Sequence, residues 1–146
     1  MENSDLKKIT SFGILGISII GFFVVLTEWF AGFWLPFYAE ERYSCLTCEY
    51  WTFIDLASQV LILLLIIGQI FVVLNDILPN QIIEKDLTLF GLLFAIGTII
   101  FTVIGLIGFG IAYSEYEWWP EAGFYAGIIT GLINSILFTI QFKKKL

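Results

Sequence analysis

Two cysteines separated by two residues form the most reactive pair in the chain. Cys45 and Cys48 lie in a polar stretch between two long apolar segments, and the chain has no other cysteine. A disulfide within a C-x-x-C sequence closes a small ring and is often redox-active. Two hypotheses follow from this spacing: a thiol–disulfide redox pair, or a structural disulfide that closes the loop in an oxidising compartment.

The chain contains no histidine, which excludes several kinds of chemistry. Haem with two histidine ligands, histidine-based zinc or copper sites and a histidine general base are all ruled out. Two thiolates complete a tetrahedral zinc site only if Glu49 or a second subunit adds ligands, so we predict no metal site. Nucleotide-binding and hydrolase motifs are absent too, and the residues alone predict no cofactor.

Carboxylates and tryptophans gather in two polar stretches, 36–51 and 113–121. The residues concerned are Glu40, Glu41, Glu49, Glu115, Glu117, Glu121, Trp118 and Trp119, with Arg42 as the single cation. This excess of negative charge attracts cations or cationic partners. The net charge of −6 argues against a nucleic-acid partner, because phosphate binding needs clustered lysines and arginines. We call these two stretches the outer cap.

The rest of the chain is apolar enough to require a bilayer. Of its 146 residues 59% are hydrophobic and 14% charged, and the mean hydropathy is +0.93. Apolar segments lie near 10–35, 52–76, 87–112 and 122–142. Each is long enough for a transmembrane helix, which needs about 20 residues. We predict one all-α domain: a four-helix antiparallel transmembrane bundle in contact with the lipid bilayer.

The basic residues predict how the bundle is oriented. Lys7, Lys8, Lys85 and Lys143–Lys145 flank one side of the predicted membrane, and only Arg42 flanks the other. Because cytoplasmic loops are enriched in lysine and arginine, both termini are predicted to be cytoplasmic, in the plasma or cytoplasmic membrane. In a eukaryotic host, Lys143–Lys145 near the end of the sequence would also match a dilysine signal for retrieval to the endoplasmic reticulum.

Small residues recur along one face of the fourth segment. Gly123, Gly127, Gly131 and Ser135 are spaced by four. Helices in lipid associate through close packing at such faces, because lipid tails provide no hydrophobic driving force between helices. We predict close helix contacts here. The partner is either another helix of the same chain or a second protein, including a second copy of this one.

Polar residues also interrupt the apolar segments. They are Glu28, Asp55, Gln59, Gln69 and Asn134. Those of the second segment share one helical stripe, which should face the bundle or a neighbour because polar groups in hydrocarbon are costly. Glu28 and Asp55 lie near the outer ends of their segments. They are interpreted as a cation or proton site, as hydrated interfacial carboxylates, or as partners of Arg42.

Four predicted spans with a C-x-x-C in the first outer loop resemble the DsbB family of quinone-linked thiol oxidants. The sequence Cys45-Leu-Thr-Cys48-Glu49-Tyr50 is similar to the family's C-x-L-C-x-Y stretch, with the leucine displaced by one position. The resemblance implies that Cys45 and Cys48 pass electrons to a bound quinone. The family's second cysteine pair is absent from 113–121, and Thr52 stands where the family has a quinone-associated arginine.

A second resemblance concerns claudin-like four-span proteins. Trp29, the sequence Gly32-Phe33-Trp34 and the two following cysteines resemble the W…G-L-W…C…C signature of their first outer loop. In that family the loop is longer, its cysteines are further apart, and it folds as a small sheet. We expect the roughly sixteen residues available here to build no such sheet. This is a resemblance of topology, which does not carry function.

These observations favour a small membrane protein without enzymatic activity. It would act as a subunit, scaffold or interaction partner through its glycine-rich helix faces and its outer cap. The first alternative is a DsbB-like thiol oxidoreductase that uses Cys45 and Cys48. The second is a cation or proton channel or transporter, based on the polar stripe of the second segment.

Overall fold

Four long helices make up most of the protein. The computed structural model describes residues 3–35, 39–43 and 53–144. The helices are α1 (Asn3–Thr27), α2 (Phe53–Ile77), α3 (Thr88–Ala112) and α4 (Ala122–Lys143). Each is long and apolar enough to cross a membrane. The prediction of four such helices is confirmed, and they indicate an integral membrane protein.

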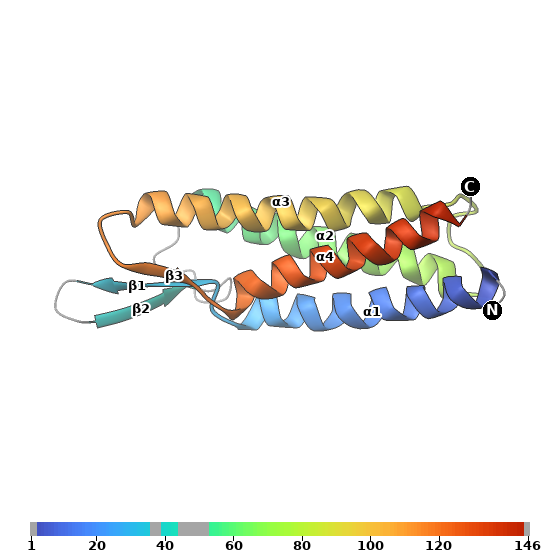
Figure 1. Cartoon of the computed structure of the whole chain (residues 1–146), viewed down its shortest axis with the longest axis horizontal. Helices are drawn as coiled ribbons and strands as arrows, with labels where there is room; N and C mark the ends of the chain where they lie inside the picture. Colours follow the sequence, from blue (N-terminus) through green and yellow to red (C-terminus); the bar gives the residue numbers. More distant parts are fainter. Residues whose placement is uncertain (1–2, 36–38, 44–52, 145–146) are drawn as a thin grey trace.

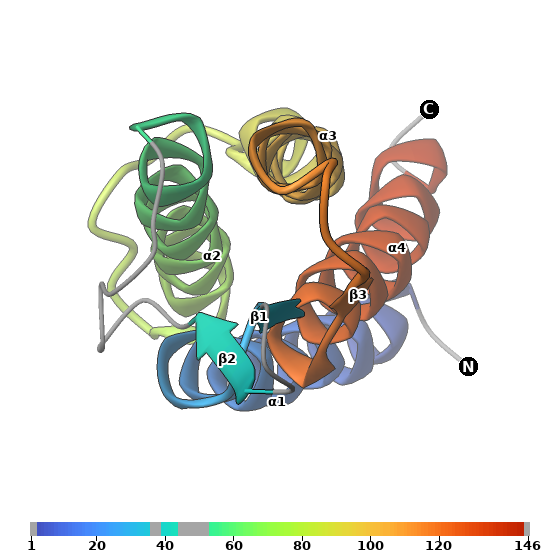
Figure 2. The same cartoon turned by 90° about the vertical axis from the view of Figure 1, so that its left-hand side faces the viewer.

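The helices form a four-helix bundle in which each helix packs against two neighbours. α1 contacts α2 and α4, and α3 contacts the same two helices from the other side. Figure 1 shows the helices side by side along the long axis, and Figure 2 shows them arranged around that axis. α1 begins and α4 ends at the same end of the bundle, which we call the terminal end (Figure 1). The opposite end, which carries the strands, is the cap end.

Three short strands form a sheet at the cap end. They are β1 (Ala31–Leu35), β2 (Ala39–Tyr43) and β3 (Trp118–Pro120), in the order β2-β1-β3. Both pairings are antiparallel, with Phe33 opposite Glu41 in one and opposite Trp118 in the other. The sheet therefore joins the two outer loops that the sequence analysis treated separately.

The sheet corrects two predictions. The first apolar segment was predicted as one span over 10–35, but α1 ends at Thr27 and residues 31–35 are a strand. An apolar run alone does not distinguish a buried strand from a helix, and aromatic residues favour strands. The expectation that the roughly sixteen loop residues build no such sheet also needs correction: they supply only β2, but β1 from the predicted first span and β3 from the second outer loop complete a three-stranded sheet.

The interior consists of two apolar clusters stacked along the bundle. The cluster at the cap end is built from Val25, Phe30, Phe33, Ile62, Ile66 and Phe109. The cluster at the terminal end is built from Ile14, Val72, Val73, Ala95 and Phe138. Large apolar side chains such as Ile20, Leu64 and Ile107 are exposed on the outside. Soluble proteins rarely expose so much apolar surface, so the outside of the bundle suits contact with lipid.

Candidate functional site

One stripe of α2 faces the centre of the bundle along its whole length. Its members Asp55, Gln59, Ile62, Ile66, Gln69 and Val73 are all fully buried. Steps of three and four residues keep them on one helix face. The structure therefore places the polar residues of α2 in the bundle interior, between the two apolar clusters and at the cap end.

A hydrogen-bond network at mid-bundle joins all four helices. Asn134 of α4 donates through Nδ2 to Ser18 Oγ of α1 at 2.8 Å and to Gln69 Oε1 of α2 at 2.7 Å. Gln69 Nε2 donates to Thr98 Oγ1 of α3 at 2.9 Å. Thr98 in turn donates to the carbonyl of Phe94 at 2.9 Å. We call Ser18, Gln69, Thr98 and Asn134 the central network; it fixes the relative positions of the helices.

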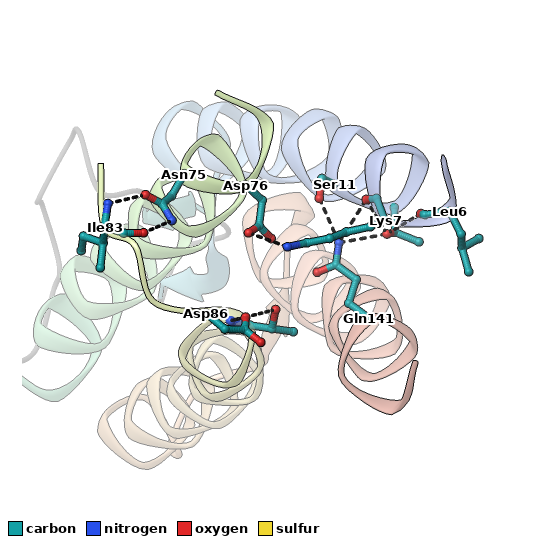
Figure 3. A network of polar contacts seen from close by, with 10 residues as sticks. Leu6, Lys7, Ser11, Asn75, Asp76, Ile83, Asp86 and Gln141 are labelled. Atoms are coloured by element: carbon teal, nitrogen blue, oxygen red, sulfur yellow. Dashed lines mark hydrogen bonds and ion pairs between the residues drawn. The ribbon is translucent and has the colours of Figure 1, made fainter. Parts of the chain in front are cut away.

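A second polar cluster closes the terminal end. Figure 3 shows Lys7 of α1 reaching Asp76 of α2, where Lys7 Nζ lies 2.8 Å from Asp76 Oδ1. In the same view Gln141 of α4 points toward Ser11, and its Nε2 donates to Ser11 Oγ and to Thr10 Oγ1, both at 2.9 Å. These contacts attach α1 to both of its neighbours. From the sequence, Lys7 indicated only the orientation of the chain, and these contacts were not predicted.

The loop between α2 and α3 is fixed by side chains that bond to its backbone. Asn75 Nδ2 donates to the carbonyl of Ile83 at 3.1 Å, and the Ile83 N–H donates to Asn75 Oδ1 at 2.8 Å (Figure 3). Asp86 accepts hydrogen bonds from the N–H and hydroxyl of Thr88, the first residue of α3. The first N–H groups of a helix have no partner within the helix, so this carboxylate stabilises the start of α3.

Gln59 differs from Gln69 although both lie on the same buried stripe. Neither the nitrogen nor the oxygen of its amide makes a hydrogen bond within the described part of the chain. One turn earlier, Asp55 is buried and accepts a hydrogen bond from the Leu56 N–H at 2.8 Å. A buried amide without a partner costs stability, because it has lost its bonds to water.

Glu28 does not lie inside the membrane helix as predicted. It follows Thr27, the last residue of α1, and its side chain is exposed. The chain turns here toward β1, which ends the helix earlier than the sequence suggested. The exposed position agrees with the interpretation of Glu28 as a hydrated interfacial carboxylate, whereas Asp55 is fully buried.

The small-residue face of α4 packs within the chain. A Cβ atom added to Gly123 would lie 3.1 Å from the carbonyl oxygen of Trp29. One added to Gly127 would lie 2.5 Å from Thr102 Oγ1, and one added to Gly131 would lie 2.5 Å from Ile99 Cγ1. These glycines bring α4 against α3 and against the connection after α1. A partner protein or second copy would therefore have to use another face of α4.

The outer cap is held to the helix ends by aromatic contacts. Phe33 of β1 stacks on Tyr113 at the end of α3, with ring centroids 4.2 Å apart. Trp119 of β3 donates through Nε1 to Glu121 at 2.7 Å and lies beside Trp34, with ring centroids 5.9 Å apart. Where the structure describes it, at 39–43 and 113–121, the outer cap is therefore joined to β1 and to the end of α3.

Charged and aromatic side chains remain exposed on this cap. Glu115 and Glu117 are exposed, and Trp34 and Trp118 are 40% and 38% exposed. Glu41 is half-buried, while Glu40 and Arg42 belong to β2. Cys45, Cys48 and Glu49 lie outside the described residues. Within the described ranges, no three carboxylate, thiol or imidazole groups gather as metal ligands would.

Comparison with known protein families, characterised proteins and solved structures gives no match. The fold and its polar interior define a class: a four-helix membrane protein with a small sheet at one end. The resemblances to DsbB-like and claudin-like proteins remain hypotheses.

Proposed function

We propose that this protein is a membrane scaffold or interaction partner whose outer cap binds a cationic partner. In this proposal the bundle is antiparallel, crosses the plasma or cytoplasmic membrane with both termini in the cytoplasm, and presents the cap outside. The lysine distribution supports this orientation, since six lysines flank the cytoplasmic side and Arg42 alone flanks the cap.

The single observation that carries the proposal is that the described part of the cap is held in place and still exposes charge. β1 pairs with β2 on one side and with β3 on the other, and its Phe33 packs on Tyr113, so these strands have little conformational freedom to lose on binding. Glu115 and Glu117 stand exposed beside the partly exposed Trp118. An ordered surface with exposed carboxylates and tryptophan suits a lysine- or arginine-rich partner, through charge attraction and cation–π contact.

The bundle interior supports a scaffold more than a transport pathway. Most groups of the central network bond to one another, although Asn134 Oδ1 and the Gln59 amide have no partner within the described residues, and the stripe of α2 is interrupted by Ile62 and Ile66. A cation pathway would need polar groups that remain available to the ion along its length. The channel hypothesis therefore has less support than the binding hypothesis.

Removing the cap carboxylates is expected to weaken binding of a cationic peptide. An oligolysine peptide should bind the detergent-purified protein, with a change in tryptophan fluorescence. The double variant Glu115→Gln, Glu117→Gln should bind roughly three- to tenfold more weakly at low ionic strength, because each exposed charge pair contributes only modestly. Raising the salt concentration should remove most of the difference.

The matched control is Glu84→Gln. Glu84 is an exposed carboxylate in the loop between α2 and α3, away from the cap. This variant loses a charge of the same sign but should bind the peptide as the original protein does. If the Glu84 variant weakens binding as much as the cap variants, binding reflects net charge, and the cap has no specific role.

The thiol-redox hypothesis is the second candidate, favoured by where the cysteines fall in the chain. Cys45 and Cys48 come between β2 and α2 in the sequence, directly after a strand of the sheet and shortly before a membrane helix. If the pair is catalytic, alkylation of the purified protein should detect thiols after reduction and should lose them again on addition of quinone. A pair that stays oxidised or stays free whatever is added would rule out quinone-linked oxidation.

A further inference from the structure

A groove opens on the outer surface between α3 and α4, near the terminal end. Its volume is about 360 Å³. It is lined by Leu92, Ile96, Ser135, Ile136, Thr139, Ile140 and Lys143. Apolar side chains from both helices form its walls, and the last basic residue of α4 lies at one end. Figure 1 shows α4 inclined to α3 along the bundle.

We propose that this groove binds an anionic phospholipid, with an acyl chain between the helices and the phosphate beside Lys143. The apolar part of the groove lies within the segments of α3 and α4 that can span the membrane. Lys143 is the last residue of α4, at the level where the headgroup of a membrane lipid would lie. Basic residues at the membrane boundary between helices are the usual means of holding anionic lipid headgroups.

The charge of Lys143 is available to such a headgroup. Its side chain is exposed, and within the described residues the only ion pair joins Lys7 to Asp76. Lysine also has a flexible apolar stem that can lie along the groove wall while its ammonium group reaches the lipid phosphate. The short side chain of Ser135 leaves space between the helices farther from the end of α4.

A second groove in the same protein lacks the charged end. It lies between α1 and α4, has a volume of about 260 Å³ and is lined by Ile17, Ile20, Gly21, Val24, Ala126, Ile129, Thr130 and Ile133. It offers an acyl chain the same apolar contact but offers a headgroup no basic side chain. Selection between headgroups is therefore expected only at the groove that ends at Lys143.

The proposal is tested by native mass spectrometry of the full chain with added lipid. The purified protein is mixed with phosphatidylglycerol or with phosphatidylcholine of the same acyl chains, and retained lipid is measured. Phosphatidylglycerol should be retained about fivefold better, as expected for one lysine near an anionic headgroup. Lys143→Gln should abolish this preference, and Ser135→Phe, which fills the groove, should lower retention of both lipids.

The matched control is Lys144→Gln. Lys144 is the next residue, is also exposed and is not among the residues that line the groove. Its replacement should leave the lipid preference unchanged. The proposal is overturned if the original protein retains the two lipids equally, if Lys144→Gln removes the preference as Lys143→Gln does, or if the groove is covered by a second copy that prevents lipid retention.

Discussion

Replacement of Gln69 by leucine is expected to destabilise the bundle, whereas the same replacement at Gln59 is expected to stabilise it. Both residues are fully buried on the same stripe of α2. Gln69 donates to Thr98 and accepts from Asn134, but the amide of Gln59 has no hydrogen-bond partner within the described chain. Burial and residue type are the same at the two positions. The expected opposite changes in stability therefore come from the hydrogen-bond partners, which only Gln69 has.

The sizes of the two effects follow from the cost of unpaired polar groups. Gln69→Leu removes two hydrogen bonds and leaves the Asn134 amide with fewer partners, which should cost about 1–3 kcal/mol. Gln59→Leu replaces an unpaired amide by an apolar side chain of similar size, which should increase the free energy of unfolding by about 1 kcal/mol. Unfolding in mixed micelles of detergent and dodecyl sulfate measures both values.

A double-variant cycle separates the hydrogen bond from other effects. If Gln69 and Asn134 stabilise the bundle by bonding to each other, the cost of Gln69→Leu plus Asn134→Leu should be smaller than the sum of the single costs. The pair Gln59→Leu plus Asn134→Leu should be additive. Destabilisation by Gln59→Leu of the same size as by Gln69→Leu would contradict the contrast drawn between the two residues.

The sequence predicts the membrane helices well because lipid imposes a strong requirement on length and apolarity. The buried stripe of α2 was also predictable, since its polar residues recur every three or four positions. The hydrogen-bond partners of these residues could not be predicted, because they depend on how the other helices are shifted along their axes and rotated about them. Ser18 illustrates this: it is a small polar residue between Ile17 and Ile19, and only the fold brings it to Asn134.

The cap was harder to predict than the bundle. Residues 31–35 continue the apolar segment before them, and an apolar run does not by itself distinguish a strand from a longer helix. Its pairing with β3 is a contact between residues far apart in the sequence. The small-residue face of α4 was recognised, but its partner could not be, because glycine spacing is the same for contacts within a chain and between chains.

Replacement of Gly131 by alanine is expected to force α4 away from α3. The added Cβ would lie 2.5 Å from Ile99 Cγ1, 3.0 Å from the carbonyl oxygen of Ala95 and 3.2 Å from the nitrogen of Ile99. Two of these atoms belong to the backbone of α3, which cannot move aside as a flexible side chain can. The free energy of unfolding should fall by about 1–3 kcal/mol, as is usual for overpacked interiors, and Gly131→Leu should cost more.

Gly16→Ala provides the control for this change in side-chain size. Gly16 lies in α1, and a Cβ added there would meet nothing within 4 Å. Alanine favours the helix over glycine by up to about 1 kcal/mol, so this variant should be as stable as the original protein or slightly more stable. Unfolding of both variants in mixed micelles makes the comparison. If the Gly131 and Gly16 variants are equally stable, α4 does not contact the backbone of α3 at Gly131. That result would contradict the conclusion that the small-residue face of α4 packs against α3.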